Sequence, residues 1–542
     1  MKSCLFLISL LFLVNSSPEA SLRSLSSYVN PITRVRIETV NSALYQLPPR
    51  GTLSMDDFIN EMINQANAYA LGPPEVVFMI YRWIGNNIEF DCYNTMYYPS
   101  YVPYKDYDVY NQGKGGDLGI TNLFNTMVNR FPFQSVSLRG WSKVKPMVGG
   151  KLPQEPDHIW NGVTFENASY LIDVAWGMGV CYGPQFTREY SDFYFCTDPN
   201  IFIRSHLPEK PEWQLLNPPK TVTEFVNMLK LTKNFYENGF QTVSPDKSSV
   251  SPSTSGKLTF TITYENIPKD LSTQLLYYNN ETWLEQENAC WIDKNPTSAD
   301  ITCFTNFKGT NKLYVFGANY GVTPLPFLFE YDVVVSKNAL NPQGVPQLYK
   351  VFLAGRDFHL IEPLNNPLKR SRGIKFKIKS TDFSNLYIIN YDPARSNRHY
   401  RELDYKSGGE FSGEEVYIFG KEVHIATRTE DGFNYIVRYD TIRDSTKAVD
   451  ASFPYSYDAP KNILYSPQMD TLRIKQGYNF KIKCESCQRI CIRDGNNYID
   501  LTRNSDSTFT GYVTINGGGD RVEILNCNSN ACSPMYYYLL TY

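Results

Sequence analysis

The chain has 542 residues, with 52 Lys and Arg against 55 Asp and Glu, so its formal net charge is -3 at pH 7. This balance argues against a nucleic-acid or polyanion binder, which needs a basic surface. Aromatic residues make up 15% and charged residues 20% of the chain, a composition typical of a folded protein rather than a disordered one. At about 100–200 residues per domain, the length predicts several domains.

A short apolar run opens the chain. Lys2 precedes the run 4–14, and small residues follow up to Ala20, a pattern that predicts a secretory signal peptide over 1–20. The run is shorter than the roughly 20 apolar residues that span a bilayer, and no other segment approaches that length. We therefore expect a protein secreted outside the cell or into the lumen of the secretory pathway, without a transmembrane segment.

The cysteines cluster along the chain, which predicts local disulfides in an oxidising compartment. The disulfide candidates are Cys181, Cys196, Cys290, Cys303, Cys484, Cys487, Cys491, Cys527 and Cys532. We expect Cys181 to pair with Cys196 and find Cys92 to be the only candidate for an unpaired thiol in the first domain. Five cysteines in the last module leave one over, which bonds Cys92, another chain or nothing. Because the compartment favours oxidation, we expect no metal at Cys484 and Cys487.

Two sequons, at Asn167 and Asn280, are candidate glycosylation sites if they lie on exposed turns.

Helical periodicity dominates the first part of the chain after the leader. Apolar residues at helical spacing predict a helix over 54–70, capped by Ser54 with Asp57, and a second helix follows it at once. A third helix is predicted to begin near Asp117. The pattern then changes to short strands over 136–141, 158–165 and 169–176, the last two joined as a hairpin. Helices followed by an antiparallel sheet predict an α+β domain.

A helical stretch over 221–236, with Thr221 and Glu224 as a capping box, separates this domain from a region of strands. The segment 373–378 matches 477–482, and 329–332, 437–440 and 540–542 are similar endings. A period of about 100 residues predicts three tandem β-sandwiches of the immunoglobulin kind. The predicted organisation is a signal peptide (1–20), an α+β domain (21–217), a helical linker (218–243) and sandwiches over 244–340, 341–445 and 446–542.

The α+β domain carries two residues suited to catalysis. Nucleophilic catalysis by a thiol needs a Cys at a helix N-terminus, a His that takes its proton and a carboxylate or amide that orients the His. His158 opens one predicted strand and Asp173 lies across the hairpin, so we expect hydrogen-bond contact between them.

At these residues the chain resembles the transglutaminase-like superfamily of papain-like folds, and within it the kyphoscoliosis peptidase-like branch. The resemblance covers roughly 55–217 and rests on 80–91, on the His158 and Asp173 strands, and on 194–216, which includes His206-Leu207-Pro208. It implies the papain-like fold and the order nucleophile, His, Asp along the chain. Sandwich modules like those predicted downstream are often carried by this branch.

The resemblance also implies a Cys in a Gly-x-Cys-x-Gly-Tyr-Ala segment, but here Asp117 stands at that position in Gly115-Gly116-Asp117-Leu118-Gly119. A carboxylate is a poor nucleophile toward amides. Cys181 lies after Asp173 and on the wrong side of the hairpin, and Cys92 could act only within reach of His158. Asp117 also suits a helix N-cap, and Asp117, His158 and Asp173 would form a metal site if they converged.

We expect a secreted, catalytically inactive transglutaminase-like protein that acts in binding, adhesion or extracellular scaffolding, without a cofactor. Its expected partner is a protein or surface-glycan ligand, and not a nucleic acid. The alternative is an active cysteine peptidase or protein-glutamine transferase-like enzyme that uses another nucleophile or a metal.

Overall fold

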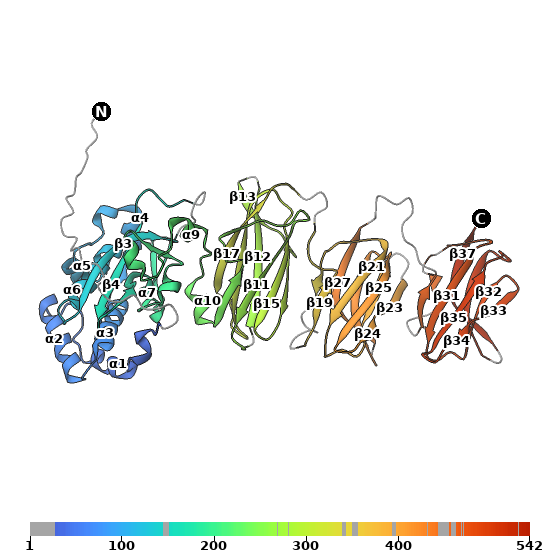
Figure 1. Cartoon of the computed structure of the whole chain (residues 1–542), viewed down its shortest axis with the longest axis horizontal. Coiled ribbons are helices and arrows are strands. Elements are labelled where there is room, and N and C mark those ends of the chain that lie inside the picture. The colour runs from blue at the N-terminus through green and yellow to red at the C-terminus, as the bar shows by residue number, and fades with distance from the viewer. Residues whose placement is uncertain are drawn as a thin grey trace, which may run out of the picture. The chain divides into compact units, whose positions relative to one another are not determined.

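The computed structural model describes most of the chain beyond the leader (Figure 1). The described residues are 28–144, 151–267, 269–279, 281–338, 343–349, 356–392, 397–430, 432–442, 455–456, 462–467, 469, 471–528 and 531–542. The chain forms two compact units, and the first consists of the residues up to Gly239 together with Asp246–Ser249 and Phe327–Glu330. The predicted signal peptide and Asn280 lie outside the described residues.

Helices make up much of the first unit. They are α1 (Ile37–Tyr45), α2 (Met55–Ala68), α3 (Pro73–Asn87), α4 (Cys92–Tyr97), α5 (Asp106–Gln112), α6 (Asp117–Val128), α7 (Val174–Met178), α8 (Pro199–Phe202), α9 (Val222–Asn227) and α10 (Lys233–Glu237). The predictions of α2, α3 and α6 are confirmed, and the Ser54 side chain accepts a hydrogen bond from the Asp57 backbone N–H, as its capping role requires.

The predicted helical stretch 221–236 is wrong as a single helix. Thr221 and Glu224 do form the predicted capping box, but α9 ends at Asn227 and α10 begins only at Lys233. Phe225 and Val226 of α9 are buried against residues of the first unit, so this segment belongs to the core of that unit instead of linking two domains freely.

The first unit contains a four-stranded antiparallel sheet in the order β5-β4-β3-β8. Its strands are β3 (Gln134–Ser142), β4 (His158–Phe165), β5 (Ala168–Ile172) and β8 (His206–Pro208). Two small pairs accompany it, β1 (Glu89–Phe90) with β2 (Lys114–Gly115) and β6 (Gly179–Tyr182) with β7 (Gln185–Arg188).

The predicted hairpin between β4 and β5 is confirmed, with Glu166 and Asn167 in its turn at positive φ angles of 51° and 58°. Asn167 is exposed, so its glycosylation stays a prediction. The second strand ends earlier than predicted, at Ile172 instead of Trp176. The reason is Asp173, whose side chain accepts a hydrogen bond from the Trp176 N–H and so caps α7.

Packing of α6 against the sheet fixes where this helix begins. Leu123, Phe124 and Met127 are buried on one face of α6, and the helix contacts both β3 and β4. At its first turn, a Cβ added to Gly119 would lie 2.3 Å from the Pro103 carbonyl oxygen, so only glycine permits this close approach. The N-terminus of α6 also lies beside His158, the first residue of β4, which the Asp117 side chain contacts.

Three successive β-modules follow, each with two sheets (Figure 1). The first has β10 (Ser249–Val250), β17 (Phe327–Val335), β16 (Gly309–Asn319), β12 (Lys269–Asn279) and β13 (Thr282–Glu285) in one sheet and β14 (Cys290–Lys294), β15 (Ser298–Phe304), β11 (Lys257–Tyr264) and β9 (Phe240–Ser244) in the other. The second has β18 (Gln347–Leu348), β27 (Gly432–Ile442), β26 (Glu422–Thr429), β22 (Tyr387–Asp392), β23 (Asn397–Glu402) and β20 (Leu368–Lys369), opposite β19 (His359–Glu362), β21 (Ser371–Lys379), β25 (Glu410–Ile418) and β24 (Asp404–Lys406).

The third module repeats the second. Its sheets contain β28 (Tyr455–Ser456), β37 (Cys532–Thr541), β36 (Arg521–Cys527), β32 (Arg489–Asp494), β33 (Asn497–Asp500) and β30 (Thr471–Arg473), and β29 (Asn462–Ser466), β31 (Gly477–Cys484), β35 (Thr508–Thr514) and β34 (Thr502–Arg503). Residues of both sheets share one core, as in a β-sandwich.

A buried tyrosine marks the same position in each module. Tyr331, Tyr439 and Tyr538 donate their hydroxyl groups to the carbonyl oxygens of Pro245, Pro363 and Pro467 at 2.7, 2.8 and 2.9 Å. Each ring also lies edge-on to a buried phenylalanine, in the pairs Phe260–Tyr331, Phe376–Tyr439 and Phe480–Tyr538. The predicted threefold repeat is therefore confirmed, but its third ending is Tyr538 and not the exposed Tyr542.

The disulfides correct two predictions about the first unit, the partner of Cys181 and the free state of Cys92. Cys290–Cys303, Cys484–Cys487 and Cys527–Cys532 join cysteines close in sequence, in agreement with the prediction of local disulfides, which left the pairing within the last module open. The pairing of Cys181 with Cys196 is wrong, because Cys181 is joined to Cys92 and Cys196 is free and buried. The cysteine left over in the last module is Cys491, which is also free and buried.

Candidate functional site

Asp117, the residue predicted at the nucleophile position, is the first residue of α6. The predicted N-cap role is wrong by one residue, since Gly116 is the N-cap and the Asp117 Oδ1 accepts a hydrogen bond from the adjacent Leu118 N–H at 2.9 Å. The other oxygen, Oδ2, lies 3.2 Å from Nδ1 of His158. With a third of its side chain exposed, Asp117 is the solvent-facing member of the site.

His158 lies between two carboxylates. Its Nδ1 contacts Asp117, and its Nε2 lies 2.7 Å from Oδ2 of Asp173. The predicted contact between His158 and Asp173 is confirmed, and the hairpin of β4 and β5 produces it as expected. Asp117, His158 and Asp173 thus lie in one row from solvent to core, since the side chains of His158 and Asp173 are only 6% and 1% exposed.

A fourth residue, His206, was not expected in the site. It is the first residue of β8, its Nε2 lies 3.0 Å from the same Asp173 oxygen, and its Nδ1 lies 2.8 Å from the Ser205 hydroxyl. Its side chain is fully buried. In the sequence, the segment His206-Leu207-Pro208 belongs to the family resemblance, and no local spacing relates it to Asp173, which is 33 residues away.

Aromatic rings enclose the two imidazoles. The ring of Trp176 stacks on His158, with centroids 5.4 Å apart, and lies 4.4 Å from His206. Phe202 stacks on His206 at 4.0 Å, and the buried Trp160 contacts both histidines. These rings remove water from the site, which strengthens the electrostatic interactions between its charged groups.

The two imidazoles differ in protonation. Burial alone would lower the pKa of His158, but the charge of Asp173 and the hydrogen bonds to Asp117 and Asp173 raise it to about 10. Burial lowers the pKa of His206 to about 4, although Asp173 opposes this effect. Burial would raise the pKa of Asp173, but His158 and His206 hold it well below its ordinary value. At neutral pH the site therefore contains a His158 imidazolium, a neutral His206 and an Asp173 carboxylate.

This charge state decides what the site can do. Both ring nitrogens of the His158 imidazolium donate hydrogen bonds, so neither has a lone pair with which to accept a proton. A general base near neutral pH needs a pKa close to the working pH and a free acceptor nitrogen, and His158 has neither. The side chain that contacts Nδ1 of His158 is the Asp117 carboxylate, a poor nucleophile, so the arrangement is an ion-pair network.

Neither alternative thiol lies free beside His158. The prediction that Cys92 is unpaired is wrong, since it forms the disulfide with Cys181, which also rules out Cys181 as a nucleophile in this state. Cys196 is fully buried, and burial raises the pKa of its thiol well above the ordinary value. A thiol of this kind is not activated for attack.

A metal would have to compete with the ion pairs. His158, Asp173 and His206 bring one ligand atom each within 4.8 Å of the others, a different set from the predicted Asp117, His158 and Asp173. The Nε2 atoms of both histidines already donate to Asp173, so binding would require loss of those protons. A separate cavity of about 730 Å³ in the same unit is lined by residues such as Arg82, Tyr190 and Asp192, and by none of the four site residues.

The chain thus combines an α+β unit, in which an Asp–His–Asp row runs from solvent to core, with three β-sandwich modules. The family model described as "KY-like, immunoglobulin-like domain" matches residues 222–346. Kyphoscoliosis peptidase of Mus musculus is 25% identical over 505 residues, which cover 89% of this chain and 74% of the mouse protein. Kyphoscoliosis peptidase of Homo sapiens is 30% identical over 265 residues, or 48% of this chain and 38% of the human protein.

The chain is thus related to the kyphoscoliosis peptidase-like branch, as the sequence predicted. Hillarin of Drosophila melanogaster is 27% identical over 186 residues, covering 32% of this chain and 22% of hillarin. Solved structures of an ICAM-5 D1-D4 ectodomain fragment and of titin domains I67-I69 are each 8% identical, cover 55% and 54% of this chain and 76% and 94% of their own, and have TM-scores of 0.12 and 0.11. TM-scores this low carry no argument about the fold.

Within the described residues, no helix is both long enough and apolar enough to cross a membrane.

Proposed function

We propose that this chain is a secreted protein whose transglutaminase-like domain is catalytically inactive, and that it acts in binding, adhesion or extracellular scaffolding. The observation that carries the proposal is the hydrogen-bonded row of Asp117, His158 and Asp173. In the proposed alignment Asp117 occupies the nucleophile position, where a carboxylate cannot form the thioester on which transglutaminase-like chemistry depends.

The protonated state of His158 also supports the proposal that the domain is catalytically inactive. A catalytic imidazole has to release and accept a proton during each turnover. His158 is held as an imidazolium by two carboxylates, so its protonation is part of the structure of the site. Removal of its proton at neutral pH would leave Asp173 and Asp117 with a weaker partner, at a cost in stability.

The rest of the chain supports the proposed location and role. Four disulfides among the described residues suit an oxidising compartment, and the apolar run before Ala20 suits a secretory leader. Tandem sandwiches offer several exposed loops and strand edges, which are surfaces that proteins use for recognition. The proposed partner is a protein or a surface glycan.

The first experiment measures amine incorporation and peptide cleavage by the full chain, beside Asp117→Cys and the double variant Asp117→Cys/His158→Ala. Wild type is expected to be inactive, and Asp117→Cys is expected to gain activity that iodoacetamide abolishes. The double variant controls for any reactivity of the new thiol that is independent of His158. Activity in the wild type would contradict the proposal.

A second candidate function is a metal-dependent hydrolase, which the convergence of His158, Asp173 and His206 favours. Assays of the wild type with and without added divalent metal and chelator separate the two functions. Metal-dependent turnover that is lost in His206→Ala, with folding intact, would establish the second candidate.

Secretion is tested by expressing the full chain in eukaryotic cells and comparing medium with lysate. The protein is expected in the medium without residues 1–20 and with a glycan on Asn167 that Asn167→Gln removes. Binding to arrays of glycans and extracellular proteins is expected to be the same for wild type and for folded His158→Ala. Retention in the cytosol, or loss of binding in that variant, would contradict this part of the proposal.

A further inference from the structure

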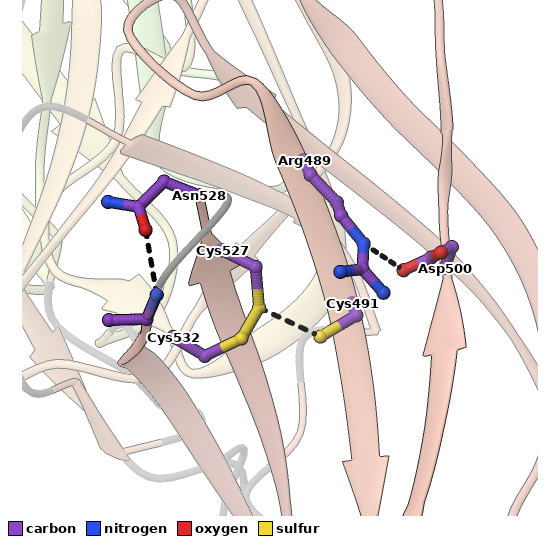
Figure 2. The surroundings of a disulfide bond; sticks show 7 residues. Arg489, Cys491, Asp500, Cys527, Asn528 and Cys532 are labelled. Atoms are coloured by element: carbon purple, nitrogen blue, oxygen red, sulfur yellow. Dashed lines mark hydrogen bonds and ion pairs between the residues drawn. A yellow bond between two sulfur atoms is a disulfide. The ribbon is translucent and has the colours of Figure 1, made fainter.

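Three cysteines meet in the last module, outside the site described above (Figure 2). The Cys527–Cys532 disulfide joins the end of β36 to the start of β37, where these two residues are register partners. Cys491 lies on β32, which pairs with β36 on its other side. The three sulfur atoms all lie within 4.8 Å of one another.

The free thiol is directed at one sulfur of the disulfide. Sγ of Cys491 is 3.2 Å from Sγ of Cys527, as the dashed line between sulfur atoms in Figure 2 shows. Cys491 and Cys527 are buried, whereas Cys532 is exposed. A thiol in this position can attack Cys527 without leaving the core, and the sulfur that would then be released is the one at the surface.

Thiol–disulfide exchange requires contact between the attacking sulfur and one sulfur of the disulfide, together with loss of the proton from the attacking thiol. A thiolate attacks one sulfur of a disulfide, and the other sulfur leaves as a thiolate. Other cysteines of the chain show the contrast, because Cys196 is also free and buried but has no disulfide described beside it.

We propose that Cys491, Cys527 and Cys532 form an exchange centre that presents Cys532 as a reactive surface thiol toward low-molecular-weight or protein disulfides. In the first step the Cys491 Sγ–Cys527 Sγ bond forms, the Cys527 Sγ–Cys532 Sγ bond breaks, and the electron pair of the broken bond stays on Cys532. The proton lost by Cys491 is taken up by Cys532 or by water. One disulfide and one thiol are present before and after, so this step needs no oxidant.

In the second step the Cys532 thiolate attacks an external disulfide of the form RSSR. A Cys532–SR mixed disulfide forms and one RS⁻ leaves, so the external disulfide is the only co-reactant. The exposed position of Cys532 admits such a reagent, whereas the buried Cys491 excludes it. The modification site is therefore Cys532, although the resting free thiol is Cys491.

Burial and charged neighbours together determine the pKa of the Cys491 thiol. Burial raises the pKa of Cys491, while Arg489 and Arg493 lower it in part and Asp500 opposes them. Nε of Arg489 is fixed by a 2.7 Å hydrogen bond to Asp500, which Figure 2 shows next to the sulfur atoms. Cys491 thus rests as a thiol, and the exchanged form with Cys532 free is the one that reacts outward.

The test uses the full chain, purified without reductant, incubated with oxidised glutathione and then quenched with N-ethylmaleimide. Mass spectrometry of non-reduced peptides is expected to find glutathione on Cys532 together with a new Cys491–Cys527 linkage. Cys491→Ser is expected to keep the Cys527–Cys532 disulfide and to lose at least ten-fold in glutathione on Cys532. The matched control, Cys196→Ser, removes the other buried thiol and is expected to change nothing.

Three results would overturn the proposal: glutathione on Cys491 instead of Cys532, unchanged labelling of Cys532 in Cys491→Ser, or no labelling in the wild type. If Cys491→Ser does not fold, the wild-type peptide map decides alone. The Cys491–Cys527 linkage must then appear with the Cys532 adduct, and an adduct without that linkage refutes the exchange step.

Discussion

Replacing Asp173 by Asn removes the negative charge that two buried imidazoles share. Oδ2 of Asp173 accepts hydrogen bonds from His158 at 2.7 Å and from His206 at 3.0 Å, and its side chain is 1% exposed. Breaking a buried pair by removing one partner costs about 3–5 kcal/mol, because the other charge stays buried without compensation. Asp173→Asn is therefore expected to lower the free energy of unfolding of the first unit by about that amount.

The pH dependence of stability gives a second and sharper expectation. The folded pKa of His158 is about 10, above its ordinary 6.5, so its contribution is complete below pH 6.5 and is lost as the pH rises toward 10. The folded pKa of His206 is about 4, below 6.5, so its contribution is lost as the pH falls from 6.5 toward 4. The stability that these two histidines contribute is thus greatest near pH 6.5.

In Asp173→Asn, the largest of the influences that raise the pKa of His158 is gone. The decline in stability between pH 6.5 and 10 is then expected to flatten. For the wild type the decline has an upper bound of about 5 kcal/mol, at 1.36 kcal/mol per pKa unit. Lys143, whose pKa burial lowers to about 7, contributes a change of opposite sign above pH 7, so the test compares the two pH profiles: the wild type has to lose more stability, or gain less, than Asp173→Asn between pH 6.5 and 9.5.

The assay has to report on the first unit alone, because a multidomain chain does not unfold in two states. Hydrogen exchange of peptides that contain β4 and β5, measured in urea at pH 6.5, 8 and 9.5, meets this need. The matched control is Asp56→Asn, which breaks an exposed ion pair with Arg130 and should cost at most about 1 kcal/mol. Equal effects of the two substitutions, or a pH slope that Asp173→Asn leaves unchanged, would refute the reasoning.

Other substitutions test the rest of the structure. Cys92→Ser opens a disulfide with a sequence separation of 89 and is expected to cost the first unit about 4 kcal/mol, visible as a lower melting temperature; no shift would argue against the Cys92–Cys181 pair. Tyr439→Phe removes the hydrogen bond to Pro363 and is expected to cost the second sandwich about 1 kcal/mol in urea unfolding, and a stabilising effect would contradict this. Burial lowers the pKa of Lys143 to about 7, so Lys143→Met is expected to stabilise the first unit by about 1–2 kcal/mol at pH 6, with the gain fading as the pH rises above 7 toward 10.5. A gain that grows with pH would have the wrong sign.

Features of this structure could be predicted from the sequence where the interacting residues are close together in the chain. Ser54 caps α2 through Asp57, three residues away, and the β4–β5 hairpin closes over two residues, so local patterns sufficed. The alternation of residues over 169–176 predicts a strand through Asp173, whereas the Asp173 side chain accepts a hydrogen bond from the Trp176 N–H and so starts a helix. The spacing of apolar residues does not show that Asp173 caps a helix instead of continuing the strand.

Interactions between distant segments could not be predicted in the same way. Nearness in sequence predicts that Cys181 pairs with Cys196, but Cys181 lies on β6 and is bonded to Cys92 at the start of α4, so proximity in the fold determines the pairing. His206 joins Asp173 because β8 lies beside β3 in the sheet, an order that no local pattern specifies. The contact of His158 with Asp173 could therefore be predicted, because a local hairpin brings them together. His206 could not be predicted, because it reaches the site on a strand that is distant in sequence.

The Asp117 carboxylate contributes to holding the His158 ring in its protonated form. In a thiol–imidazole pair, a sulfur anion lies beside a protonated ring, and in this chain the Asp117 carboxylate lies 3.2 Å from the His158 imidazolium. The carboxylate and the sulfur anion are both negatively charged, so a protonated His158 is stabilised beside either of them. His158 and Asp173 can therefore retain their hydrogen bond and their burial. What differs is the reactivity of the anion, because a carboxylate is a far weaker nucleophile than a thiolate. Asp117→Asn, which removes this charge but keeps the shape, is accordingly expected to lower the pKa of His158, as measured by NMR titration of its ring protons, and an unchanged pKa would show that Asp117 has no part in holding the imidazolium.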